Sequence, residues 1–290
     1  MGQLISIPPL GKYTQPLRNM FERLDFNLLD ELPITQKMIE KGCRHSSEMM
    51  CFPYKYTLAY FIESLEKGAN TLLMFDSCGQ CRLKQYYIVQ DFTLKNLGYN
   101  YEMIPIKINH IFKSFKKIDK NLSVLKILRN LIITWKEIKE IDEGLQIKEI
   151  NVGVIGEIYS CIESKLNFDI EYKIKKAGLN PYNDVTLSGF LKTFLPTKNK
   201  YLKQAYKFFN GELGGHGIEN VASVLMMIEE KFKGIIWIRP LSCSPEVMVD
   251  PIIRELCNRA NMPLLVLDID ETNAEANVST RIETFFELIT

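Results

Sequence analysis

The chain has 290 residues, of which 46% are hydrophobic and 24% are charged, and its formal net charge is +1. These values are typical of a globular protein, so disorder, collagen-like repeats and a coiled coil are excluded as the main architecture. The lack of a basic excess argues against a nucleic-acid partner. No apolar run reaches the roughly 18 residues that cross a bilayer, and no signal peptide is visible, so we expect a cytoplasmic protein without a membrane partner.

The first 109 residues are predicted to form an N-terminal α/β lobe. Short apolar runs alternate with segments whose apolar residues recur at helical spacing, which is the rhythm of a parallel sheet with covering helices. The predicted strands are residues 4–7, 71–75 and 101–106. The predicted helices are residues 15–24, 33–40, 54–67 and 82–96, the last three followed by the stop signals Gly42, Gly68 and Gly98.

Residues 110–149 contain no strand signal and are predicted to be a helical connector. Residues 150–290 resume the alternation and are predicted to form a C-terminal α/β lobe, so the fold class is α/β with a parallel sheet in each lobe. The predicted strands of this lobe are residues 151–156, 234–238 and 263–267. Its predicted helices are residues 218–230, a helix starting at Pro245, and residues 279–288. The pair Gly153 and Gly156 is a weak phosphate-loop signal.

The seven cysteines are an odd number, which argues against a disulfide framework and for a reducing compartment. In open parallel sheets, ligands collect beyond the carboxyl ends of the strands. Cys78, Cys81 and Cys243 directly follow predicted strands and are therefore site candidates. Cys51 precedes a predicted helix, whose dipole favours a thiolate. Cys257 lies on the apolar side of a predicted helix and is expected to be a buried core residue.

Thiolates on loops of both lobes could meet around one soft metal centre, and iron–sulfur clusters are the usual centre for several thiolates. The pair Cys78 and Cys81 could instead be half of a zinc site or the dithiol of a thioredoxin-type active site. The cysteines could also be chemically inert. Composition and spacing leave these alternatives open.

Six motifs together resemble a known family. They are residues 48–55, 79–82, 214–219, 243–246, 270–271 and 280–285. Their order is similar to that of the 2-hydroxyacyl-CoA dehydratase family, which includes benzoyl-CoA reductase subunits and the D component of 2-hydroxyglutaryl-CoA dehydratase. Within this family, the chain most resembles the activase-related, double-cubane-like branch.

The resemblance implies two Rossmann-like lobes with an iron–sulfur cluster, [4Fe-4S] or double-cubane, in the cleft between them. The matching ligand positions are Cys51, Cys81 and Cys243. Cys78 departs from the family pattern and is a possible fourth ligand. The resemblance also implies that a separate ATP-hydrolysing iron–sulfur activator delivers low-potential electrons, because this chain has no phosphate loop with Gly-Lys-Ser/Thr. The reaction would be a difficult reduction or the dehydration of a 2-hydroxyacyl-CoA.

Further residues are candidates for binding and catalysis. His216 and Glu246 are catalytic candidates, although a carboxylate at the position of Glu246 also stabilises a helix N-terminus. The candidates for binding an acyl-CoA or another small substrate are Gly214, Gly215, His216 and Lys55. We expect Glu219 to anchor its loop, and Arg281 to pair with Asp270 and Glu271 and so fix the last helix.

Two other functions remain open at this stage. The chain could be a non-catalytic electron-transfer or docking subunit, or a thiol–disulfide oxidoreductase that uses Cys78 and Cys81. A homodimer, or a heterodimer with a related subunit, is expected from the resemblance.

Overall fold

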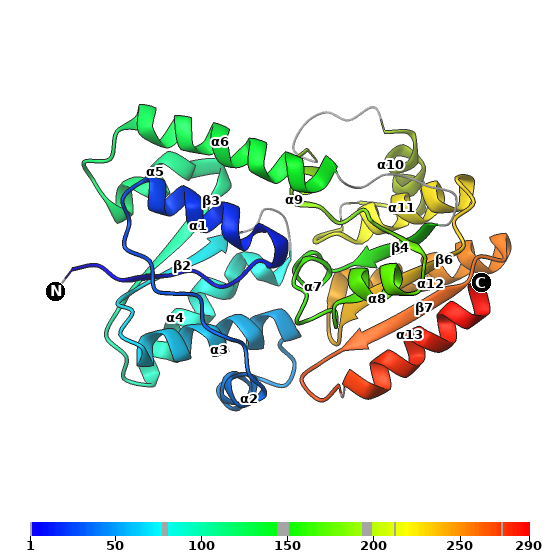
Figure 1. Cartoon of the computed structure of the whole chain (residues 1–290), viewed down its shortest axis with the longest axis horizontal. Coiled ribbons are helices and arrows are strands. Elements are labelled where there is room, and N and C mark those ends of the chain that lie inside the picture. The colour runs from blue at the N-terminus through cyan, green and yellow to red at the C-terminus, as the bar shows by residue number, and fades with distance from the viewer. Residues whose placement is uncertain (1, 77–80, 144–150, 193–198, 212, 274) are drawn as a thin grey trace. The chain divides into compact units, whose positions relative to one another are not determined.

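The computed structural model describes residues 2–76, 81–143, 151–192, 199–211, 213–273 and 275–290. The chain divides into two compact units, which we call unit 1 (Met1–Lys139) and unit 2 (Glu140–Thr290) (Figure 1). The boundary falls inside the helix α6 (Val124–Glu143), so most of the helical segment predicted as a connector belongs to unit 1.

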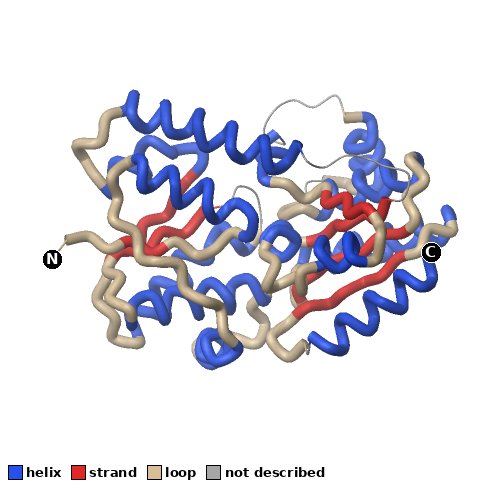
Figure 2. The backbone as a smooth tube through the Cα atoms, viewed as in Figure 1, coloured by secondary structure: helices blue, strands red, loops and turns tan. Residues whose placement is uncertain are grey.

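Unit 1 contains a parallel sheet in the order β1-β2-β3, with β2 in the centre (Figure 2). The strands are β1 (Ile5–Ser6), β2 (Thr71–Asp76) and β3 (Glu102–Lys107). The other elements are η1 (Gly11–Tyr13), α1 (Thr14–Arg23), α2 (Gln36–Arg44), α3 (Phe52–Glu66), η2 (Arg82–Gln85), α4 (Tyr86–Asn96), η3 (Ile108–His110), α5 (Ile111–Ile118) and the first part of α6. Leu72, Leu73 and Met74 of β2 are buried, as expected of a central strand covered on both faces.

Gly42 corrects one sequence prediction, because it lies inside α2 and does not end it. A Cβ atom at this position would lie 2.4 Å from the carbonyl oxygen of Lys55 and 2.6 Å from Cβ of Ala59. The missing side chain therefore allows α2 to pack closely on α3. In the sequence this glycine resembles a helix stop signal. In the structure a glycine is required there because α3 lies too close for a side chain.

Arg23, at the end of α1, fastens α6 to unit 1. Its Nε donates to Asn130 at 2.9 Å, its Nη1 to Glu137 at 2.8 Å and its Nη2 to Thr134 at 2.8 Å. The planar guanidinium fits three acceptors that lie on one face of the helix at spacings of three and four residues.

Unit 2 contains a four-stranded parallel sheet in the order β5-β4-β6-β7. The strands are β4 (Asn151–Gly156), β5 (Asn180–Asn183), β6 (Gly234–Pro240) and β7 (Leu264–Ile269). The other elements are α7 (Ile158–Ile162), α8 (Ile170–Lys176), α9 (Leu187–Lys192), α10 (Lys200–Ala205), η4 (Tyr206–Phe208), α11 (Gly217–Glu229), α12 (Ser244–Ala260) and α13 (Glu275–Ile289).

The strand order of unit 2 contains a switch point. The chain runs from β4 to β5 on one side, and then returns to place β6 on the other side of β4. The crevice outside the carboxyl ends of the two strands at such a point is the usual ligand position in open α/β sheets. Residues that follow β4 and β6 are therefore the first candidates for chemistry in this unit.

The strand β5 was not predicted from the sequence. Its residues, Asn-Pro-Tyr-Asn, are typical of a turn. Proline is tolerated here because β5 is an edge strand that pairs only with β4. The predicted α/β class with parallel sheets is confirmed, whereas a cleft that holds a cluster stays a prediction.

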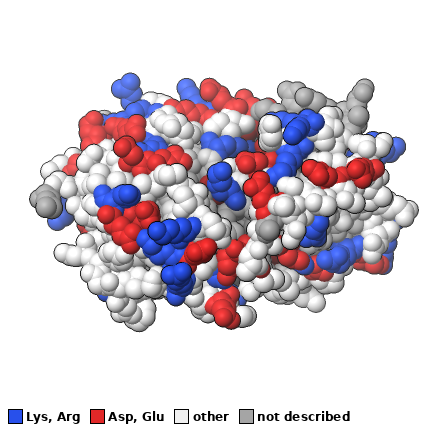
Figure 3. Space-filling model, turned by 60° about the horizontal axis from the view of Figure 1, so that its bottom comes forward, with Lys and Arg blue, Asp and Glu red and all other residues white. Residues whose placement is uncertain are grey.

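Two surface properties bear on possible partners. On the face shown in Figure 3, basic and acidic side chains are interspersed, as the near-zero net charge suggests. In the part of the chain that the structure describes, no helix is both long enough and apolar enough to span a bilayer.

Candidate functional site

The two predicted cysteine ligands of unit 1 each stand directly before a helix. Cys51 is the N-cap of α3 and Cys81 is the N-cap of η2, and both have extended backbone angles. The buried Sγ of Cys51 forms a hydrogen bond with the hydroxyl of Tyr86. Cys78, with the rest of residues 77–80, lies outside the described residues, so its roles as a fourth ligand or a redox partner of Cys81 stay predictions.

The third predicted ligand has the same local geometry in unit 2. Cys243 is the N-cap of α12, directly after the turn that leaves β6, and it is buried. Its backbone N–H donates to the carbonyl of Pro240 at 3.0 Å. Ser242 just before it has a left-handed backbone with φ of 68°, which is uncommon for a residue other than glycine. The turn therefore places Cys243 just beyond the carboxyl end of β6, one of the two strands at the switch point.

The donor set fits an iron–sulfur centre in its chemistry. Cysteine sulfur is the usual ligand of such centres, and each of the three cysteines directly precedes a helix. Within the ranges that the structure describes, no three His, Cys, Asp or Glu side chains form a group that could hold a metal ion. Cys51 and Cys81 belong to unit 1 and Cys243 to unit 2, so a shared centre stays a prediction.

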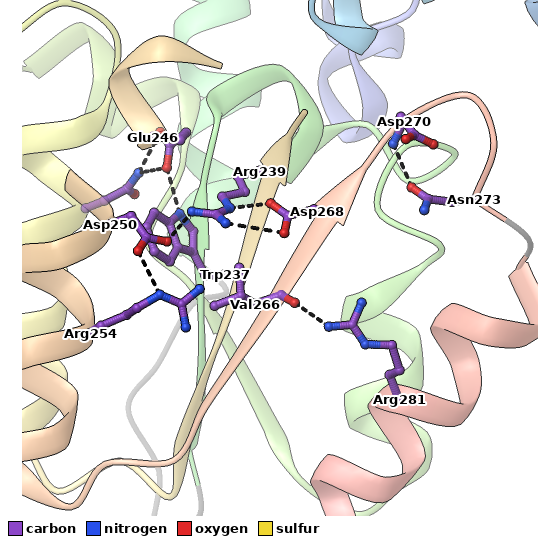
Figure 4. Close-up of polar contacts among 11 residues, drawn as sticks. Trp237, Arg239, Glu246, Asp250, Arg254, Val266, Asp268, Asp270, Asn273 and Arg281 are labelled. Atoms are coloured by element: carbon purple, nitrogen blue, oxygen red, sulfur yellow. Dashed lines mark hydrogen bonds and ion pairs between the residues drawn. The ribbon is translucent and has the colours of Figure 1, made fainter. Parts of the chain in front are cut away.

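Glu246, one turn after Cys243, is the centre of a buried network that also contains Gly156, Asn220 and Trp237. We call this the Glu246 network. Trp237 Nε1 donates to Glu246 Oε2 at 2.7 Å, and Asn220 Nδ2 lies 3.0 Å from both carboxyl oxygens (Figure 4). Asn220 also exchanges two 3.1 Å bonds with the backbone of Gly156 at the end of β4. The network thus joins β4, β6, α11 and α12.

Burial raises the pKa of Glu246 to about 8, and the nearby Glu157 carboxyl contributes to the rise. The bonds from Trp237 and Asn220 and the charge of Arg239 act in the opposite direction without cancelling it. Glu246 therefore holds a proton at neutral pH. A protonated carboxylic acid this close to the switch point is chemically able to give or take a proton.

The side chain of Glu157 occupies the turn in which Gly153 and Gly156 suggested a phosphate loop. It is the N-cap of α7, and its carboxyl oxygens accept from the N–H groups of Tyr159 at 3.0 Å and Ser160 at 2.9 Å. In dinucleotide-binding folds, such N–H groups bind a phosphate. Here the side chain of the protein itself takes them, so the phosphate-loop interpretation is wrong for this turn.

The predicted binding loop with Gly214, Gly215 and His216 packs against the start of α12. A Cβ atom on Gly215, which has φ of +75°, would lie 2.8 Å from Cγ of Pro245. Two motifs that are well separated in the sequence are thus in contact. His216 is the N-cap of α11, and burial lowers its pKa to about 4, so its imidazole is neutral at physiological pH.

The remaining predicted site residues are placed as follows. Lys55 is buried in the first turns of α3, one turn after Cys51. Glu219 lies in the first turn of α11, and burial raises its pKa. Asp270 closes a turn by accepting from the N–H and the hydroxyl of Thr272, both at 2.7 Å.

Arg281 has a contact that the sequence did not suggest. Its Nη2 donates to the carbonyl oxygen of Val266 in β7 at 2.7 Å (Figure 4). This bond attaches α13 to the sheet, so the predicted role in fixing the last helix has a direct structural basis. The predicted ion pairs of Arg281 with Asp270 and Glu271 stay predictions.

Sequence reasoning missed three residues near the switch point, namely Asn220, Trp237 and Glu157. Asn220 carried a usable signal, because it is an amide on the otherwise apolar face of the predicted helix at 218–230. Trp237 gave none, since a tryptophan in an apolar strand is explained by packing alone. Glu157 accepts hydrogen bonds from Tyr159 and Ser160, which are close to it in the sequence. Its role as a helix cap was missed because the short helix α7 was not predicted.

A family model, "2-hydroxyglutaryl-CoA dehydratase, D-component", matches residues 217–289, about a quarter of the chain. No curated protein sequence matches the chain. The matched residues run from α11 to α13 and contain Cys243, Asn220, Trp237 and Glu246. The motifs before residue 217 and the assignment to the activase-related branch stay predictions. Residues 217–289 are thus similar to the 2-hydroxyglutaryl-CoA dehydratase D-component family.

Proposed function

We propose that the chain is an iron–sulfur component of a 2-hydroxyacyl-CoA dehydratase-type system. Cys51, Cys81 and Cys243 would hold the centre, either [4Fe-4S] or double-cubane. When bound, such a centre supplies a low-potential electron for a reduction or for the dehydration of an acyl-CoA substrate. The electrons would come from a separate ATP-hydrolysing activator.

The position of Cys243 is the observation that carries this proposal. It lies inside the segment that matches the D-component family, at the N-cap of a helix and beside the switch point of the sheet. Each of these features favours a functional thiolate there. The same N-cap position of Cys51 and Cys81 supports their role as the other two ligands.

The other residues of unit 2 have supporting roles in this proposal. Glu246 holds a proton one turn from the thiol, and neutral His216 lies at the start of the neighbouring helix α11. The loop of Gly214 and Gly215, which contacts Pro245, would bind part of the substrate. Lys55 in unit 1 is the proposed basic contact for it.

Anaerobic purification followed by iron analysis and a visible spectrum tests the proposal. We expect a brown protein, and we expect Cys51→Ala, Cys81→Ala and Cys243→Ala each to abolish iron binding, because each loses one of three ligands. Cys257→Ala is the matched control, since Cys257 is a buried thiol at the other end of α12. Full iron content in a ligand variant would remove that cysteine from the set.

A thiol–disulfide oxidoreductase is the alternative that this experiment separates. A colourless anaerobic protein with two titratable thiols, lost in Cys78→Ala and Cys81→Ala, would favour that function. A brown protein that shows no acyl-CoA turnover with a suitable activator would favour an electron-transfer or docking subunit.

A further inference from the structure

We propose that Asn220 and Glu246 are positioning residues that hold Cys243 in place at the carboxyl edge of the unit 2 sheet. The inference deepens the proposed function and rests on it, because Cys243 matters as a ligand of the centre. Neither residue needs to contact the centre or a substrate for this role.

The turn that carries Cys243 leads directly into the first turn of α12. Leu241 is exposed and Ser242 has a left-handed backbone. The N–H of Leu241 donates to Ile269 at 2.9 Å, and that of Cys243 donates to Pro240 at 3.0 Å. The carbonyl oxygen of Cys243 accepts from the N–H of Val247 at 3.0 Å, so the position of Cys243 depends on where the first turn of α12 is fixed.

Glu246 fixes that turn from inside the unit. It is the third residue of α12, it is 1% exposed, and its oxygens accept N–H groups from β6 and from α11. A helix-start carboxylate that only offset the helix dipole would face solvent near its own backbone. Glu246 is instead buried and bonded to two other elements, which makes it an anchor.

Asn220 determines which group is required at position 246. The backbone of Gly156 donates to Asn220 Oδ1 and accepts from Nδ2, so the amide has only one orientation. Its Nδ2 must then face position 246 as a donor. Trp237 Nε1 is a donor only. Position 246 therefore needs an acceptor that both donors can reach. Oε2 of Glu246 lies 3.0 Å from Nδ2 of Asn220 and 2.7 Å from Nε1 of Trp237, whereas an alanine offers no acceptor.

Alkylation of the metal-free full-length chain tests this argument. Cys243 is buried, so it reacts only when the start of α12 opens locally. We expect Glu246→Ala and Asn220→Ser to speed alkylation of Cys243 about tenfold, as follows from the loss of buried hydrogen bonds. Peptide mapping by mass spectrometry measures Cys243 and Cys257 in the same sample.

Cys257 and Glu255 provide the controls. Cys257 is buried at the far end of α12, so its rate should stay unchanged if the effect is local. Glu255→Gln removes an exposed carboxylate of the same helix that pairs with Arg259, and it should change neither rate. Equal acceleration of both thiols, or no acceleration of Cys243, would overturn the inference.

The double variant Asn220→Ser with Glu246→Ala tests the pairing itself. Each single change removes the hydrogen bond between Nδ2 of Asn220 and the carboxyl group of Glu246, so the two effects on the Cys243 rate should be less than additive. Independent effects, whose rate factors multiply in the double variant, would contradict the pairing.

The loaded protein gives a second readout. Glu246→Ala should alter the electron paramagnetic resonance spectrum of the centre, whereas Glu255→Gln should not. The proposed function fails on a different result, namely full iron content in Cys243→Ala. The alkylation rates need no iron, so the two failures are distinguishable.

Discussion

The indole of Trp237 links a surface ion-pair network to a buried acid. Its Nε1 donates to Glu246 at 2.7 Å, while the guanidinium of Arg239 stacks over its ring at 4.9 Å from the centroid. Arg239 in turn pairs with Asp250 and Asp268 (Figure 4). Trp237 is therefore the side chain that separates the charges of this ion-pair network from the Glu246 network, which we propose to fix Cys243.

The raised pKa of Glu246 predicts a pH-dependent stability. Between about pH 5 and pH 8 the folded chain holds a proton that the unfolded chain has lost. The free energy of unfolding of the metal-free protein should therefore fall as pH rises, by up to about 1.4 kcal/mol per pH unit from this group. Urea unfolding followed by Trp237 fluorescence, in a Trp135→Phe background, measures it.

Glu246→Gln is the control for this pH dependence, since glutamine does not titrate. Its unfolding free energy should vary less with pH, and the advantage of the wild type should shrink from about pH 5.5 to about pH 8. Identical pH profiles for the two proteins would show that Glu246 has an ordinary pKa.

Gly156→Ala should strongly destabilise unit 2. A Cβ there would lie 1.8 Å from the carbonyl oxygen of Ile238, and its φ of +143° is strained for any side chain. We expect a loss of about 3 kcal/mol or more, because backbone of β6 would have to move. Gly178→Ala, at φ of +77° in open space, should lose only about 1–2 kcal/mol in the same chemical denaturation.

Gly42→Ala tests the close packing of α2 on α3 in unit 1. Alanine favours a helix over glycine by about 1 kcal/mol in the absence of contacts. The 2.4 Å approach to the Lys55 carbonyl should reverse that sign and lower the melting temperature. Lys37→Ala, an exposed change in the same helix, serves as the comparison. A stabilised Gly42→Ala protein would refute the packing argument.

Arg23→Lys should weaken the attachment of α6 to α1. A lysine amine cannot reach Asn130, Thr134 and Glu137 together, so at least one bond is lost. Because Arg23 and Glu137 are partly exposed, we expect a moderate cost of about 1 kcal/mol. Hydrogen exchange should accelerate in α6 but not in α3, whereas Arg129→Lys, an exposed change on α6, should have no such effect.

The sequence predicted those features whose cause is local. Apolar runs marked β2, β4, β6 and β7, and Pro245 marked a helix start that the structure contains. The strand β5 was not predicted and the helical Gly42 was wrongly predicted as a helix stop, because a neighbouring strand or helix determines their conformation.

The Glu246 network could not be predicted because its members meet only through the strand order. Asn220 is 26 residues from Glu246, and Gly156 is 64 residues from Asn220. The sequence suggested a dipole role or a catalytic role for Glu246, and neither role requires a distant partner within the fold. Its side chain points into the unit because Trp237 in β6 and Asn220 in α11 donate hydrogen bonds to it there.

The cap that Glu157 forms on α7 has a consequence for anion binding. Because its carboxyl oxygens already accept from the N–H groups of Tyr159 and Ser160, a phosphate could bind these two amides only by displacing a buried side chain of the same turn. Inorganic phosphate should therefore not stabilise unit 2 through this turn.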